Sequence, residues 1–242
     1  MNVAASSKAL PLVLSMGEPA GIGGEIAAKA WKLLRQDGPA FLFLGDPALL
    51  GGQPWRAVSG PEQAASVFRD AVPVLPLILP VPAEPGRPDV RNAPAVIAAI
   101  EQGVALCRDG RAAALVTNPI QKATLTAAGF RHPGHTEFLA ELAPGGGPPV
   151  MLLAASGLRS VPVTIHCSLR QALERLNTGL ILRIARATAA GLRQDFGIDR
   201  PRLALAGLNP HAGENGTMGT EERDIIAPAI AALRQEGIDA RG

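Results

Sequence analysis

The stretch PLVLSMGEPAGIGGE, residues 11–25, decides the fold class. Its first part, Pro11–Met16, is a short and mostly apolar run that predicts a buried strand. Gly24–Gln36 is rich in Ala and Lys and predicts a helix that ends near Gly38-Pro39. Glycines between a strand and a helix let the backbone approach an anionic ligand, but they also suit a plain tight turn. The spacing does not choose between these two interpretations.

The same alternation of strand and helix continues to the end of the chain. Further strands are predicted at Phe41–Leu44, Val74–Leu79, Ala112–Val116, Val150–Ala154, Val161–Ile165 and Leu203–Ala206. Helices are predicted from an Asn92 cap to Asp109, over Pro119–Ala128, after a cap at Asn177 or Thr178, and over Thr220–Gln235, which Pro228 should kink or divide. This order predicts an α/β protein with a largely parallel sheet. We expect two α/β domains, residues 1–130 and 131–242.

Composition disfavours several classes of protein. The net charge is only +2, and the basic residues are scattered, so we expect no nucleic-acid partner. No apolar run approaches the ~18 residues that a membrane-spanning helix needs, so we expect no membrane segment. Cys107 and Cys167 form no CxxC pair, which fits a reducing cytoplasm better than a disulfide framework.

The segment VTNPIQK, residues 116–122, follows a predicted strand and carries polar side chains. Ligands of open α/β sheets bind at this edge, so Thr117, Asn118 and Lys122 could contact a phosphate or a carboxylate. Alternatively, Thr117 or Asn118 caps the next helix and Lys122 is solvated. Taken alone, the segment favours this second interpretation.

Histidines gather in the segments expected on the ligand side. The chain has four, and His135, His166 and His211 lie in loops or directly after predicted strands. His135 and Thr136 could both donate to an anion, or Thr136 could simply cap a helix. His166 and His211 could bind a divalent metal at one sheet edge. A catalytic metal usually takes three protein ligands, and no spacing identifies the third.

Five segments occur in an order that resembles one family. They are Met16-Gly-Glu-Pro-Ala-Gly-Ile-Gly, Val116-Thr-Asn-Pro-Ile-Gln-Lys, Gly134-His-Thr-Glu-Phe, Val163-Thr-Ile-His and Leu208-Asn-Pro-His-Ala-Gly-Glu, and Gly219-Thr-Glu-Glu extends the match. Together they resemble the 4-hydroxythreonine-4-phosphate dehydrogenases of vitamin B6 biosynthesis. The resemblance runs from about residue 11 to residue 242.

This resemblance implies a fold like that of isocitrate and isopropylmalate dehydrogenases, with two α/β domains and a cleft between them. It implies a homodimer with the active site near the subunit interface. It also implies oxidation of 4-phosphooxy-L-threonine by NAD or NADP, followed by decarboxylation to 3-amino-2-oxopropyl phosphate. A divalent ion, Zn, Mg or Co, would be bound by three histidines.

Carried over by motif, His166 and His211 resemble the first two metal ligands, and His135 and Thr136 resemble the substrate-binding pair. The family's third His and its later substrate-binding residues match no position up to Gly242. The resemblance therefore implies that the second domain, residues 131–242, is incomplete and that the C-terminal part is missing, and the general base and the cofactor-binding residues stay unassigned. Gly24 stands where the family usually has Pro, and we expect glycine to loosen this helix start.

Three alternatives accompany the resemblance. The same chemistry could act on a phosphorylated four-carbon sugar acid or on a dihydrodiol of an aromatic acid. The chain could also be an inactive truncated remnant or a binding module. A P-loop or sugar kinase is disfavoured because the glycine-rich turn lacks the Gly-Lys-Ser/Thr ending.

Overall fold

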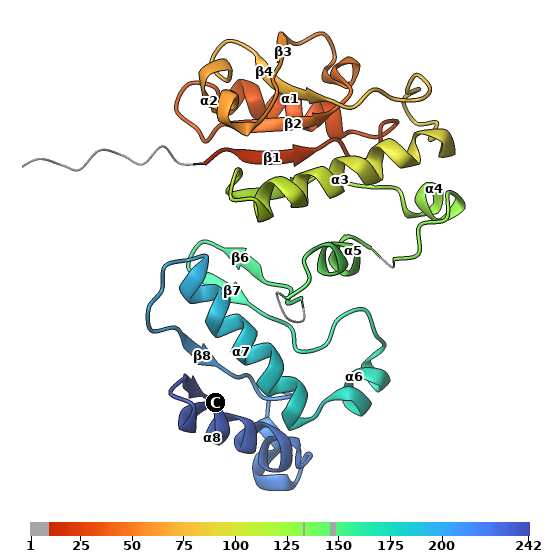
Figure 1. Cartoon of the computed structure of the whole chain (residues 1–242). Coiled ribbons are helices and arrows are strands. Elements are labelled where there is room, and N and C mark those ends of the chain that lie inside the picture. Colours follow the sequence, from red (N-terminus) through yellow and green to blue (C-terminus); the bar gives the residue numbers. More distant parts are fainter. Residues whose placement is uncertain (1–9, 133, 146–148) are drawn as a thin grey trace, which may run out of the picture. The chain divides into compact units, whose positions relative to one another are not determined.

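The computed structural model describes residues 10–132, 134–145 and 149–242. Contacts between residues divide the chain into two units, Met1–Pro144 and Gly145–Gly242 (Figure 1). This division lies later in the chain than residue 130, where the sequence suggested it. No helix of the described part is long and apolar enough to cross a membrane.

The first unit is built on a five-stranded parallel sheet, as the sequence predicts. Its strands are β1 (Leu12–Ser15), β2 (Phe41–Gly45), β3 (Trp55–Ala57), β4 (Val72–Pro76) and β5 (Ala114–Thr117). They are ordered β3-β4-β2-β1-β5. β1 therefore lies between β2, the next strand in the chain, on one side and β5, the last strand of this sheet, on the other. The gap between the ends of β1 and β5 is therefore a topological switch point, where open α/β sheets bind ligands.

Two strands differ from the expectation. β3 was not predicted, because its three residues are all exposed and give no apolar run. β4 begins at Val72 instead of Val74 and lies between β2 and β3, despite Pro73 and Pro76. Each proline lies where β4 pairs with one neighbour only: Pro73 pairs with β3 before the pairing with β2 begins at Val74, and Pro76 pairs with β2 after the pairing with β3 has ended.

Helices connect and cover these strands. They are α1 (Gly23–Leu34), α2 (Ala64–Val67), α3 (Ala93–Arg108), α4 (Lys122–Ala127) and α5 (His135–Leu142), with 3-10 turns at Pro47–Leu50, Pro61–Gln63 and Val90–Asn92. α3 packs along β1, β2 and β5 (Figure 1). α1 buries Ala27 and Trp31 in the core that these strands share with Phe68. α4 begins at Lys122, so neither Thr117 nor Asn118 caps it.

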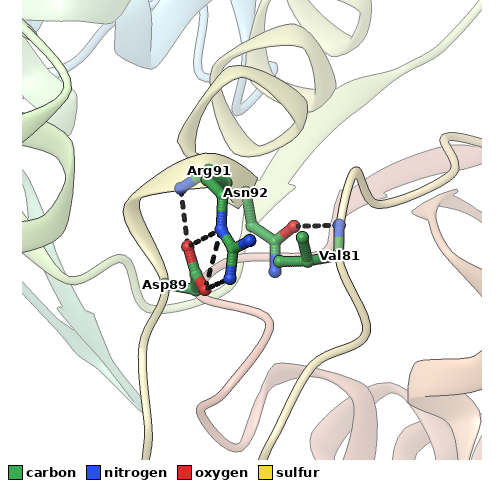
Figure 2. A network of polar contacts seen from close by, with 4 residues as sticks. All are labelled: Val81, Asp89, Arg91 and Asn92. Atoms are coloured by element: carbon green, nitrogen blue, oxygen red, sulfur yellow. Dashed lines mark hydrogen bonds and ion pairs between the residues drawn. The ribbon is translucent and has the colours of Figure 1, made fainter.

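Asn92 is the N-cap residue of α3, as predicted, but its side chain makes no cap hydrogen bond. The Asn92 side chain is buried, and its amide oxygen accepts a hydrogen bond from the Val81 amide at 3.1 Å (Figure 2). Asp89 instead caps the 3-10 turn that leads into α3, accepting from the Arg91 amide at 2.9 Å. The Arg91 guanidinium also pairs with this carboxylate, which lowers the pKa of Asp89 to about 2. Asn92 therefore fixes the segment before α3 to the helix start.

The second unit has two small sheets. β6 (Leu153–Ala155) and β7 (Leu158–Ser160) form an antiparallel hairpin, and β8 (Arg202–Ala204) pairs in parallel with β9 (Asp239–Arg241). Its helices are α6 (Leu169–Arg175), α7 (Thr178–Gln194) and α8 (Ala227–Gln235), with a 3-10 turn at Ala212–Gly216. The predicted strand at Val161–Ile165 is absent from this described segment. Pro162 lacks the amide hydrogen that the middle of a strand would donate.

Two expectations for the helices of this unit are confirmed. Asn177 caps α7, with its side-chain oxygen accepting from the Leu180 amide at 2.9 Å. The predicted Thr220–Gln235 helix is divided, because a π-helical turn at Glu222–Ile226 precedes α8, and Pro228 lies in the first turn of α8. α7 and α8 pack together and share a core that includes Ile181 and Leu233.

Replacing Asn177 with alanine should lower the stability of the second unit by about 1 kcal/mol, because one amide at the α7 start loses its acceptor. Gln194→Ala, at the exposed far end of the same helix, should change stability much less. Urea unfolding followed by circular dichroism measures both variants. Equal stabilities of the two variants would contradict the role given to the cap.

Candidate functional site

The first two motif segments meet at the switch point of the first unit. Ser15 at the end of β1 is in register with Thr117 at the end of β5. Beyond the strands, the Glu18 amide donates to the Pro119 carbonyl at 2.8 Å. The Asn118 side chain is buried and donates to the Gly23 carbonyl at 3.1 Å. These bonds hold the turn before α1 against the segment before α4.

The glycines of the first turn are required by packing within the chain. Gly17 has a φ of +71°, and a Cβ built on it would lie 2.6 Å from the Pro119 oxygen. A Cβ on Gly23 would lie 2.2 Å from the Met16 oxygen. The chain's own atoms fill the space beside both glycines, so the plain turn explains them without a ligand. Asn118 has the matching structural role of joining the two segments.

Lys122 and His135 come together in the same unit, at the starts of α4 and α5. A Cβ built on Gly134 would lie 3.5 Å from Cε and 3.6 Å from Nζ of Lys122. His135 is half-buried, and its Nε2 is buried with no hydrogen-bond partner among the described residues. Burial lowers the pKa of His135 below its ordinary 6.5, and the Lys122 charge lowers it further. The His135 ring is therefore neutral at pH 7.

Apolar contacts fix the two helix starts within the first unit. Leu125 of α4 is buried against the start of α3. Phe138 of α5 is buried, and its ring centroid lies 5.0 Å from that of Phe130, in the loop between α4 and α5. Thr136 lies in the first turn of α5 and does not cap it, because the cap position is Gly134. Its hydroxyl makes none of the side-chain cap bonds of this helix.

The His211 loop of the second unit has an unusual backbone. Ala212, Glu214 and Asn215 all have positive φ, of 48°, 41° and 58°. Such conformations cost on the order of 1–3 kcal/mol each and persist only where surrounding bonds impose them. Asn209 supplies two of these bonds, accepting from the His211 amide at 2.9 Å and donating to the Met218 carbonyl at 3.2 Å. The loop geometry is thus imposed by its own side chains.

The carboxylate of Glu214 orients the His211 ring. Its Oε1 lies 2.8 Å from His211 Nδ1, which leaves Nε2 for another partner. Both side chains are about half exposed. The sequence did not predict that Glu214 orients His211. Glu214 entered the sequence analysis only as the last residue of a motif that resembles the family.

His166 lies on the second segment of this unit that carries a candidate metal ligand. It is exposed, has a φ of 53°, and precedes Ser168, which caps α6 together with Gln171. A groove of about 920 Å³ in the second unit is lined by residues of α7 and β8 and also by Thr164 and Leu208. The segments that carry His166 and His211 thus meet at one groove, although neither His lines it.

These residues do not complete a metal centre by themselves. Within residues 10–132, 134–145 and 149–242, no group of three or more His, Cys, Asp or Glu side chains is arranged to hold a metal ion. A catalytic site usually takes three protein ligands. His166 and His211 as metal ligands therefore stay a prediction.

Comparison with known proteins identifies the family. The family model described as pyridoxal phosphate biosynthetic protein PdxA matches residues 42–242. The 4-hydroxythreonine-4-phosphate dehydrogenase of Caulobacter vibrioides is 53% identical over 241 residues, covering 96% of this chain and 72% of that protein. The enzyme of the same name from Methylorubrum populi is 52% identical, with 96% and 70% covered.

Solved structures agree with this result. The crystal structure of 4-hydroxythreonine-4-phosphate dehydrogenase from Klebsiella pneumoniae superposes with a TM-score of 0.87 at 34% identity, covering 97% of this chain and 74% of that one. A terephthalate 1,2-cis-dihydrodiol dehydrogenase from Burkholderia xenovorans gives a TM-score of 0.65 at 29% identity, with 97% and 73% covered. The predicted α/β fold of the isocitrate/isopropylmalate dehydrogenase type is confirmed. The chain belongs to the PdxA family of pyridoxal phosphate biosynthetic proteins.

Proposed function

We propose that this protein is a 4-hydroxythreonine-4-phosphate dehydrogenase that uses NAD or NADP. The observation that carries the proposal is the match of nearly the whole chain to relatives of that name, at 53% and 52% identity. In the proposed reaction, the secondary alcohol of 4-phosphooxy-L-threonine is oxidised to a ketone, with hydride passing to the nicotinamide and a proton released. The β-keto acid then loses carbon dioxide to leave 3-amino-2-oxopropyl phosphate.

His135 and Thr136 are the proposed substrate-binding pair. Neutral His135 offers one ring nitrogen as a donor and the other as an acceptor, and the Thr136 hydroxyl can donate to an anionic oxygen. Thr117 is a further candidate, because it ends β5 at the switch point. Asn118 is a weaker one, since its amide already holds Gly23.

The proposal includes a divalent metal, Zn, Mg or Co, with His166 and His211 among its ligands. It is supported by the groove that both segments border and by Glu214, which leaves Nε2 of His211 available. When bound, such an ion would polarise the substrate oxygen. We also propose a homodimer, with the active site near the interface, in the cytoplasm.

A second candidate is the same chemistry on a dihydrodiol of an aromatic acid. It is favoured by the match to the terephthalate dihydrodiol dehydrogenase, but that TM-score of 0.65 is below the 0.87 of the Klebsiella pneumoniae enzyme. The phosphorylated substrate therefore remains the first proposal.

Thr136→Val should lower kcat/KM for 4-phosphooxy-L-threonine by roughly 10- to 100-fold, the worth of one hydrogen bond to a charged group. Reduction of NAD or NADP, followed by absorbance, measures it with added divalent metal. Thr126→Val, on the exposed surface of α4, is the control and should act like the unchanged protein. Turnover of a dihydrodiol, with none of 4-phosphooxy-L-threonine, would reverse the choice of substrate.

A further inference from the structure

Lys122, at the start of α4, forms no ion pair with any other residue that the structure describes. We propose that Lys122 is a binding residue for an oxyanion of the substrate, a phosphate or a carboxylate, which it holds together with His135 and Thr136. This inference rests on the proposed function, because that function places the substrate at the His135–Thr136 pair.

The ammonium group of Lys122 lies next to Gly134. Lys122 Nζ lies 3.6 Å from the point where a Cβ on Gly134 would be, directly before His135 in the chain. Lys122 is exposed, and Gly134 places no side chain beside its ammonium group. The ammonium group thus lies beside the residue that precedes His135, whose Nε2 has no hydrogen-bond partner among the described residues.

One acidic group faces the same place. Glu137 Oε2 lies 3.6 Å from the same Cβ position on Gly134. Glu137 and Lys122 nevertheless do not approach within the 4.0 Å of an ion pair, unlike the described pairs such as His132–Glu141 at 3.6 Å. The Glu137 carboxylate repels an incoming anion and competes for the ammonium. Removal of the Glu137 charge should therefore strengthen anion binding, whereas removal of the Lys122 charge should weaken it.

The lysine and the histidine are coupled by charge. Lys122 lowers the pKa of His135, after the larger effect of burial. An anion that neutralises Lys122 removes this contribution, so its binding should raise the titration midpoint of His135. Coupling between two sites is reciprocal, and anion binding should therefore tighten when His135 is protonated.

The test uses inorganic phosphate as the probe and histidine NMR as the readout. In the unchanged protein, we expect phosphate to raise the His135 midpoint, with the signal assigned through His135→Gln. Lys122→Met should raise the midpoint without phosphate and weaken phosphate binding by roughly 10-fold or more, since a charge-assisted hydrogen bond is lost. Lys122→Arg should restore part of the binding, and Glu137→Gln should strengthen it.

Lys29→Met is the matched control, because Lys29 is an exposed lysine on α1 of the same unit. It changes the net charge equally and should leave both readouts unchanged. In steady-state assays with 4-phosphooxy-L-threonine, Lys122→Met should raise KM more than it lowers kcat. Circular dichroism should show the same fold for both variants, since both side chains are exposed.

The outcomes separate this inference from the proposed function. If Lys122→Met binds phosphate as Lys29→Met does and leaves the His135 midpoint unmoved, the inference is wrong, whether or not the protein is active. If phosphate acts through Lys122 but no dehydrogenase activity is found, only the proposed function fails. A Glu137→Gln variant with weaker phosphate binding would also count against the anion site.

Discussion

Trp31→Ala should be the most damaging single substitution in the first unit, costing about 3–5 kcal/mol of its stability. Trp31 is 1% exposed and packs in the core with Phe41 and Phe68. Its indole Nε1 also donates to the Phe68 carbonyl at 2.7 Å. Alanine would leave a cavity and an acceptor without its donor, and these two losses add.

The chain's other tryptophan provides the control. Trp55 on β3 is 47% exposed, so Trp55→Ala should cost far less than Trp31→Ala. Denaturant unfolding followed by far-UV circular dichroism compares them without relying on tryptophan fluorescence. Trp31→Phe should fall between the two, because it keeps most of the packing and loses the hydrogen bond. Similar costs for Trp31→Ala and Trp55→Ala would show that α1 does not anchor this core.

Gly24→Ala should destabilise the first unit by about 2–3 kcal/mol, as other forced overpacking does. A Cβ on Gly24 would lie 2.0 Å from the Leu49 carbonyl oxygen, which belongs to the backbone of the Pro47–Leu50 turn. The structure adds to the expectation that glycine loosens this helix start, because a side chain there would meet the backbone of that turn. Proline, the residue usual in the family, carries the same Cβ and would fit only if the turn moved.

Gly191→Ala is the comparison for Gly24→Ala. Gly191 lies inside α7, and its Cβ would come no closer than 3.6 Å to a neighbouring side chain. Alanine there should stabilise the helix by roughly 0.5–1 kcal/mol, because an unfolded chain with alanine at this position has less conformational entropy to lose on folding than one with glycine. Thermal unfolding of both variants measures the contrast. If the Gly24→Ala protein is as stable as the unchanged one, the Pro47–Leu50 turn can shift at little cost in free energy.

Local patterns predicted the elements that bury continuous apolar runs. β1, α1 and β2 are close to their expected bounds because burial on both faces of a parallel sheet requires such runs. β3 is an exposed edge strand, and its formation depends on its neighbour β4 instead of its own composition. The hydrogen bond of the Asn92 side chain also depends on a residue outside the local pattern, because its donor is the amide of Val81, eleven residues earlier.

The candidate site was predicted in part. Motif order identified His135, Thr136 and Lys122 as residues of interest, but not that Lys122 lies beside His135. That approach depends on how Phe130 and Phe138 pack the loop between α4 and α5, which no local pattern shows. Asn118 was expected to face a ligand or cap a helix, and its buried bond to Gly23 depends on a segment 95 residues away.

The position of β5 has a consequence for how the protein folds during synthesis. β1 can pair with β2 as soon as residue 45 has emerged from the ribosome, but its other edge stays open until β5 arrives. Chain growth at about 5–20 residues per second leaves this edge unpaired for several seconds. An apolar open strand edge invites pairing with other chains. We therefore expect nascent chains that stop before residue 114 to aggregate, and chains that extend beyond β5 and α5 to be protected.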